Sequence, residues 1–117
     1  MKFSVVTIFP QIIWANLEFG ILGKAIDKEK IEVSTYDPRD YSKSPTKRVD
    51  DKPFGGGSGM VMEAGPIIKA VEEAKKKSID AHVIYLSPQG KLFNQEKAKE
   101  LADKSNIILI SGRYEGV

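Results

Sequence analysis

The sequence contains no cysteine and only one histidine among its 117 residues. Without cysteine, the chain has neither a disulfide framework nor thiolate ligands for a metal, and with one histidine we expect no zinc site. Long hydrophobic runs are also missing, because no apolar stretch approaches the roughly 20 residues that a membrane span needs. Pro10 interrupts the N-terminal apolar run and no small-residue cleavage site follows it, so we expect a cytoplasmic protein outside the membrane.

An excess of charge of one sign is absent as well. The formal net charge is +2, which is too small to indicate nucleic-acid binding by itself, so only a local cluster of basic residues could indicate it. Hydrophobic residues make up 41% and charged residues 29%, as in ordinary globular proteins. The length predicts one domain over residues 1–117.

The hydrophobic pattern predicts alternating strands and helices. Runs rich in apolar and β-branched residues predict strands over residues 2–9, 31–36, 82–86 and 107–110. We expect a helix over residues 11–27 that bends late, a second from Pro66, and a third capped by Asn94. The residues expected to face inward on the second and third helices are Ile67, Ala70, Val71, Ala74, Ala98, Leu101 and Ala102. This order predicts an α/β fold, a mostly parallel sheet with helices on both faces.

Two short polar segments follow predicted strands directly. They are "SPQG" at residues 87–90 and "SGRYEG" at residues 111–116. Ligands of open parallel sheets bind outside the carboxyl ends of the strands, so these segments are candidate binding loops that lie side by side if their strands are neighbours. Gly90 and Gly112 would let main-chain groups approach a planar ligand. The alternative is that both segments are simply tight turns between a strand and a helix.

A glycine cluster, "PFGGGSGMVM" at residues 53–62, lies in a long segment without apolar periodicity. The cluster lacks the Gly-Lys-Ser/Thr ending of a phosphate-binding loop and the spacing of the dinucleotide fingerprint. A backbone that allows close approach, with basic residues upstream, would suit the phosphodiester chain of a nucleic acid. The alternative is a solvated surface loop in which Asp50 and Asp51 pair with Arg48 and Lys52.

With these motifs assembled, the sequence resembles the bacterial tRNA (guanine-N1)-methyltransferase family, which methylates the guanine immediately 3′ of the anticodon. The matching stretches are "FP" at residues 9–10, "PRD" at 38–40, "VDDKPFGGGSGMVM" at 49–62, "YLSPQG" at 85–90 and "GRYEG" at 112–116. They occur in the family's order along the whole chain. Together they are far more specific than any one of them.

The resemblance implies a SPOUT-type methyltransferase, an α/β domain with a deep trefoil knot that acts as a homodimer on tRNA. S-adenosylmethionine would be held by the knot loops. The positions implied to bind this donor are Tyr85, Leu86, Ser87, Pro88, Gln89, Gly90, Gly112, Arg113, Tyr114, Glu115 and Gly116. The positions implied to bind tRNA are Arg48, Asp50, Lys52, Gly55, Gly56, Gly57 and Gly59.

The resemblance implies that the catalytic base lies outside these 117 residues. Guanine N1 must lose its proton as it attacks the methyl group, which calls for a positioned general base. In the family this base is an aspartate in the second half of considerably longer proteins, so no catalytic residue is expected here. The family also implies magnesium, with Glu115 as a contributor. We therefore expect an N-terminal fragment that is inactive alone, with an incomplete knot and exposed apolar surface.

Two other functions fit parts of the sequence. A non-catalytic module could retain a tRNA contact or a weak adenosine site without the catalytic half. A flavodoxin-like nucleotide-binding domain fits the order of strands and helices, but it leaves "GRYEG" and the glycine cluster unexplained.

Overall fold

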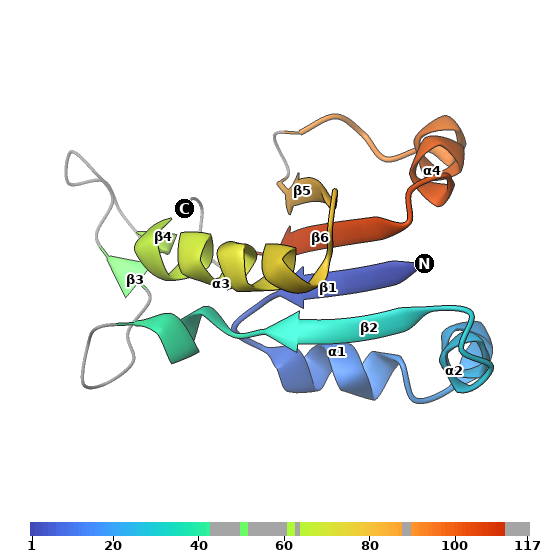
Figure 1. Ribbon diagram of the computed structural model, residues 1–117, viewed down its shortest axis with the longest axis horizontal. Coiled ribbons are helices and arrows are strands. Elements are labelled where there is room, and N and C mark those ends of the chain that lie inside the picture. Colours follow the sequence, from blue (N-terminus) through green and yellow to red (C-terminus); the bar gives the residue numbers. More distant parts are fainter. Residues whose placement is uncertain (43–49, 52–60, 63, 88–89, 112–117) are drawn as a thin grey trace.

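A computed structural model describes residues 1–42, 50–51, 61–62, 64–87 and 90–111 (Figure 1). The first part of the chain forms β1 (Lys2–Val6), α1 (Pro10–Asn16), α2 (Gly20–Asp27), β2 (Glu32–Tyr36) and the 3₁₀ helix η1 (Pro38–Tyr41). Two short strands follow, β3 (Asp50–Asp51) and β4 (Val61–Met62). The remaining elements are α3 (Ala64–Lys77), β5 (His82–Leu86), α4 (Gln95–Ala102) and β6 (Asn106–Ser111).

Four strands form one sheet in the order β2-β1-β6-β5, and all of its pairings are parallel. The predicted parallel α/β sheet is therefore confirmed. Strands β2 and β5 lie at the edges. A feature that the sequence did not predict is the separate antiparallel pair β3–β4, in which Asp50 lies opposite Met62 and Asp51 opposite Val61.

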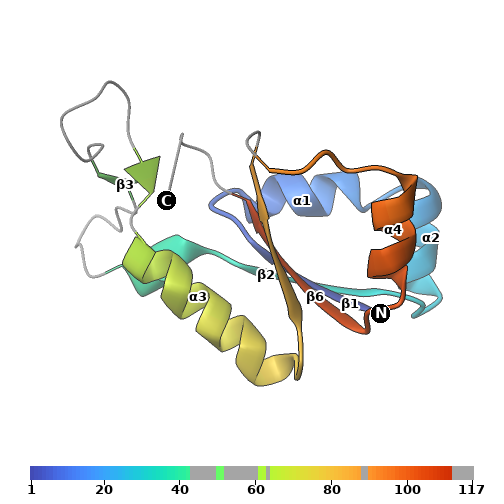
Figure 2. The ribbon, with the colours of Figure 1, turned by 90° about the horizontal axis from the view of Figure 1, so that it is seen from above.

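Helix α3 covers one face of the sheet and completes the main core (Figure 2). Val6 and Ile108 are buried against Ala70 and Ala74, whose small side chains let the helix approach the strands closely. Ile67 is buried and Val71 is half-buried, so the predicted inner stripe of α3 is confirmed. This face is tightly packed.

Helices α1, α2 and α4 lie over the opposite face and cover it incompletely (Figure 2). Two apolar cavities of about 500 and 290 Å³ remain between these helices and the sheet, and both are lined by Phe3, Leu86 and Leu109. Ala98 and Leu101 line the larger cavity, so α4 turns its predicted apolar side towards the sheet without closing on it. That an absent segment would cover exposed apolar surface of this domain stays a prediction.

The single helix expected over residues 11–27 is in fact two helices, α1 and α2, because two glycines allow a sharp break between them. Gly20 begins α2 with φ +77°, a left-handed conformation that strains any other residue. A Cβ atom on Gly23 would lie 3.0 Å from the carbonyl oxygen of Glu18, so only glycine lets α2 turn back this closely.

Two further predictions concern the N-terminal cap of α4 and membrane-spanning helices. Asn94 caps α4, since its Oδ1 accepts a hydrogen bond of 2.8 Å from the backbone N–H of Lys97, as predicted. Among the described residues, no helix is long and apolar enough to cross a membrane.

Candidate functional site

The carboxyl ends of the four parallel strands lie at one edge of the sheet (Figure 1). Strands β5 and β6 are neighbours, and their register places Leu86 opposite Ser111. The two candidate binding loops therefore begin side by side. The sequence analysis made this depend on whether the two strands are neighbours, and they are. Parallel sheets bind ligands at this kind of edge.

The first wall of this edge is formed by the end of β5 and the turn that follows it. Tyr85 and Leu86 leave 42% and 51% of their surface exposed, while Ser87 is half-buried. The backbone N–H of Gly90 donates a hydrogen bond of 3.2 Å to the carbonyl oxygen of Ser87, which closes a turn.

Turn geometry does not account for glycine at position 90. A Cβ atom there would meet only the carbonyl oxygen of Ser87, at an ordinary contact distance of 3.4 Å. Among the described glycines, only Gly20 has a positive φ. Gly90 is exposed, so its backbone is accessible to a ligand.

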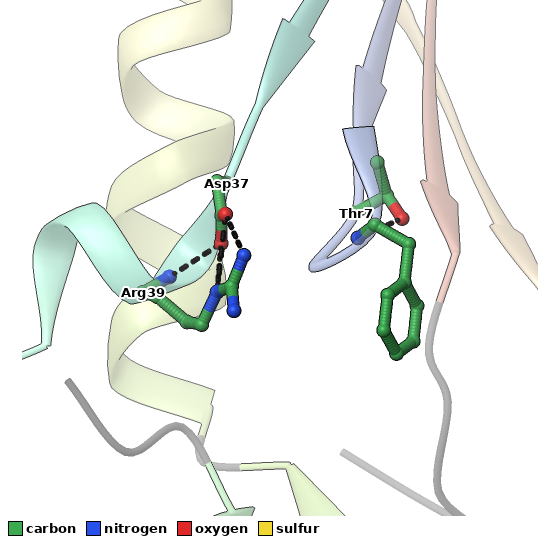
Figure 3. Close-up of polar contacts among 4 residues, drawn as sticks. Thr7, Asp37 and Arg39 are labelled. Carbon is green, nitrogen blue, oxygen red and sulfur yellow. Dashed lines mark hydrogen bonds and ion pairs between the residues drawn. The ribbon is translucent and has the colours of Figure 1, made fainter. Parts of the chain in front are cut away.

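The loop after β1 is fixed by Thr7, a residue that the sequence analysis did not single out. Its backbone N–H donates to the carbonyl oxygen of Tyr36 at 3.0 Å. Its Oγ1 accepts from the backbone N–H of Phe9 at 3.1 Å (Figure 3). The signal in the sequence was a hydroxyl residue at the end of a buried strand, placed two residues before Phe9.

Strand β2 is followed by the 3₁₀ helix η1, which Asp37 caps. Asp37 Oδ1 accepts hydrogen bonds from the backbone N–H of Arg39 at 2.9 Å and from its Nε at 3.1 Å (Figure 3). Asp37 Oδ2 accepts from Nε at 3.1 Å and from Nη2 at 2.7 Å. The hydrogen bond to Asp37 raises the pKa of Arg39, so the guanidinium remains charged.

Many of the predicted site residues lie outside the described ranges. For the donor these are Pro88, Gln89, Gly112, Arg113, Tyr114, Glu115 and Gly116, and for tRNA they are Arg48, Lys52, Gly55, Gly56, Gly57 and Gly59. Asp50 lies in β3, opposite Met62. Within the part of the chain that the structure describes, no three or more His, Asp or Glu residues are grouped to hold a metal. The magnesium contribution of Glu115 stays a prediction.

The fold defines an open parallel α/β domain, and the register of β5 and β6 places the starts of the two candidate loops at neighbouring strand ends. Comparison with known families is more specific. A family described as tRNA (Guanine-1)-methyltransferase TrmD matches residues 1–117, and the chain belongs to this family.

Individual relatives agree with this assignment. The chain is 50% identical over 117 residues to a protein of Dictyoglomus turgidum and 46% identical over 118 residues to one of Francisella tularensis subsp. holarctica, both named tRNA (guanine-N(1)-)-methyltransferase. Each match covers all of this chain and 47% of the relative. The chain thus spans about half the length of the curated relatives it matches.

A solved structure supports the fold class. The crystal structure of a tRNA (m1G37) methyltransferase from Aquifex aeolicus superposes with a TM-score of 0.90 at 41% sequence identity. The match covers all of this chain and 53% of that one. The α/β class expected from the resemblance is confirmed.

Proposed function

We propose that residues 1–117 form the N-terminal part of an enzyme that transfers a methyl group from S-adenosylmethionine to N1 of the guanine immediately 3′ of the anticodon, position 37 of tRNA. The observation that carries this proposal is the register of β5 and β6, which pairs Leu86 with Ser111 and so starts both donor loops at one place. Family membership and the relative from Aquifex aeolicus, named for m1G37, support the reaction and the substrate.

The first part of the donor site consists of Tyr85, Leu86, Ser87 and Gly90. Leu86 presents exposed apolar surface at the sheet edge, which suits the flat face of an adenine, and the exposed backbone of Gly90 lets a ligand meet the main chain. These residues fit an adenosyl group. The second part would be residues 112–116, which directly follow β6. S-adenosylmethionine, when bound, supplies an electrophilic methyl group.

The tRNA contact is proposed to come from residues 48–59. Their sequence contains Arg48, Lys52 and four glycines, and residues 52–60 connect the paired strands β3 and β4. Lysine and arginine side chains attract phosphates, and glycines allow close approach of the backbone. The complete enzyme is further proposed to act as a cytoplasmic homodimer, to use magnesium and to contain a trefoil knot that residues 1–117 do not complete.

The general base for guanine N1 is proposed to lie outside residues 1–117. Asp37 is the acidic residue directly after β2 at the carboxyl edge, but both of its oxygens accept hydrogen bonds from Arg39. Its oxygens are therefore engaged by Arg39 and are not directed at a substrate. Residues 1–117 would therefore bind and orient the reactants and have no turnover alone.

The test compares the 117-residue chain with the polypeptide of the relatives' length that begins with these residues, called the complete enzyme below. Both are titrated calorimetrically with S-adenosylmethionine and assayed with tRNA transcripts carrying guanine or adenine at position 37. We expect the complete enzyme to methylate only the guanine transcript and the 117-residue chain to methylate neither. Turnover by the pure chain would refute its inactivity, and a complete enzyme that binds the donor and tRNA without turnover would favour the non-catalytic module.

A further inference from the structure

The "FP" motif, residues 9–10, has no role in the donor site or in the methyl transfer proposed above. It lies where the chain passes from β1 into α1, at the carboxyl edge of the sheet (Figure 2). Pro10 is the first residue of α1, a position that suits proline because no helical hydrogen bond needs its N–H. What Phe9 does depends on its contacts.

The turn at Phe9 is held by Thr7, which is only 4% exposed. Phe9 precedes the first turn of α1, where backbone N–H groups have no partner within the helix. The Oγ1 of Thr7 supplies the missing acceptor, at 3.1 Å from the N–H of Phe9 (Figure 3). Thr7 is itself tied to the neighbouring strand, because its N–H donates to the carbonyl oxygen of Tyr36 at 3.0 Å.

One apolar cluster joins this turn to the end of β6. Its members are Ile8, Phe9, Ile67, Val71 and Ile110, of which Ile8 and Ile67 are buried. Ile110 is followed by Ser111, the last residue of β6, after which the second proposed donor loop begins. The position of the turn therefore affects the packing around the strand end that leads into this loop.

Ile110 also lies beside the first part of the proposed donor site. Its register partners are Val6 on β1 and Tyr85 on β5. Register partners in a parallel sheet project to the same face, so Tyr85 lies on the face that carries the cluster. The next pair along these strands is Leu86 and Ser111, where both proposed donor loops start. Ile110 thus connects the turn with both loops.

We propose that Thr7 is a positioning residue for the methyl donor: its hydroxyl fixes the turn at Phe9, and this turn supports Ile110 between the two donor loops. The inference rests on the proposed function, in which S-adenosylmethionine binds at this edge. Thr7 is buried and acts through Ile110 rather than on the reacting atoms. Its effect is on the affinity for the donor, and the affinity for tRNA stays the same.

The test is calorimetric titration of the complete enzyme with S-adenosylmethionine, using Thr7→Val and Thr7→Ser. Valine keeps the branched shape and removes the acceptor of the Phe9 N–H. We expect the dissociation constant of the donor to rise about fivefold to tenfold, the equivalent of about 1–1.4 kcal/mol, as for the loss of one hydrogen bond. KM for tRNA should stay within about twofold, and Thr7→Ser, which keeps the hydroxyl, should bind the donor within about twofold of the wild type.

The matched control is Thr35→Val, which makes the same change on β2. The Oγ1 of Thr35 also accepts one hydrogen bond, from Trp14 Nε1 at 3.3 Å, but β2 is not a neighbour of β6. Donor affinity should be unchanged in this variant. A loss in Thr35→Val or in Thr7→Ser as large as that in Thr7→Val would overturn the proposal. If Thr7→Val does not fold, Phe9→Leu keeps the hydrogen bond, reduces the contact with the cluster and should weaken donor binding in the same way.

Amide hydrogen exchange on the 117-residue chain separates this inference from the proposed function. In Thr7→Val, the backbone amides of Phe9, Ile110 and Ser111 should exchange faster, while the amide of residue 7, which donates to Tyr36, stays as protected as in the wild type. Unchanged exchange at Ile110 and Ser111 would overturn the positioning role. A wild-type complete enzyme that does not bind S-adenosylmethionine would instead overturn the proposed function, and the exchange result would still decide whether Thr7 fixes the end of β6.

Discussion

Ile108 and Leu109 are consecutive residues of β6 that point to opposite faces of the sheet, and they provide a direct test of how unequal the two faces are. Ile108 is 0% exposed and packs in the core with Val6, Ala70 and Ala74. Leu109 lines both cavities under α1, α2 and α4. Replacing either residue by alanine removes three carbon atoms, so the two variants differ mainly in their surroundings.

The expected costs follow from that difference. Three buried carbons are worth about 2.4 kcal/mol of transfer free energy, and the new cavity beside rigid neighbours brings Ile108→Ala to about 3–4 kcal/mol. Leu109 already borders empty space, so Leu109→Ala loses fewer contacts and creates little new cavity, at a cost of about 1–2 kcal/mol. The loss at Ile108 is a large fraction of the roughly 5–15 kcal/mol that stabilises a domain.

Urea unfolding of the 117-residue chain, followed by circular dichroism, measures both values. Ile108→Val, at about 0.5–1.5 kcal/mol, provides a milder variant if the alanine variant does not fold. The unfolding slope should be the same in all variants, since the exposed area changes little. A Leu109→Ala cost equal to or larger than that of Ile108→Ala would refute the unequal packing of the two faces.

Three further predictions concern single residues. Gly20→Ala should destabilise the chain by about 1 kcal/mol, because Gly20 has a φ of +77° that strains any other residue. Gly65→Ala should stabilise α3 by about 0.5–1 kcal/mol, because its φ is not positive and the space for a Cβ is open. Thermal unfolding of both variants checks these values, and equal effects would contradict the argument from backbone conformation. Asn94→Ala should lower the free energy of unfolding by about 1 kcal/mol and Asn94→Ser by much less, since only alanine removes the side-chain oxygen that accepts from the backbone N–H of Lys97. Denaturant unfolding measures both, and a neutral alanine variant would show that the cap adds no stability. Burial raises the pKa of Tyr41, so the folded state keeps the phenol proton to higher pH than the unfolded state does. The contribution of Tyr41 to the free energy of unfolding is therefore complete below about pH 10 and is lost as pH rises through the folded pKa. Tyr41→Phe should lose less stability than the wild type between about pH 9 and 11, and parallel losses would exclude this contribution.

The strands and helices were largely predictable because their patterns are local. The buried run at β1, the stripe of Ile67, Ala70 and Ala74 on α3, and the Asn94 cap each depend on neighbouring residues. The break between α1 and α2 was missed, because the apolar spacing continues through it and only the backbone of Gly20 and the close contact at Gly23 reveal it. Apolar periodicity does not register such contacts.

The site was predictable only in outline. The sequence placed two loops after two strands, but whether those strands are neighbours depends on pairing between distant segments, which the register of Leu86 and Ser111 decides. The sequence analysis did not recognise Thr7 or the ion pair between Asp37 and Arg39, because their roles depend on hydrogen bonds rather than on residue type. The short β3–β4 pair is two residues long on each side and has no periodicity to detect.

The strand order has a consequence for how the chain is made. Strand β1 is synthesised first and is paired on both sides in the finished sheet, with β2 and with β6. About 70 residues separate the end of β2 from the start of β6, so at roughly 5–20 residues per second the ribosome needs about 4–14 seconds to supply the second partner. During that time one row of N–H and C=O groups on β1 lacks its final partner, and such edges promote aggregation. The centre of this four-stranded sheet is therefore completed after both of its edge strands have been made, and folding during translation depends on how well the nascent chain protects β1.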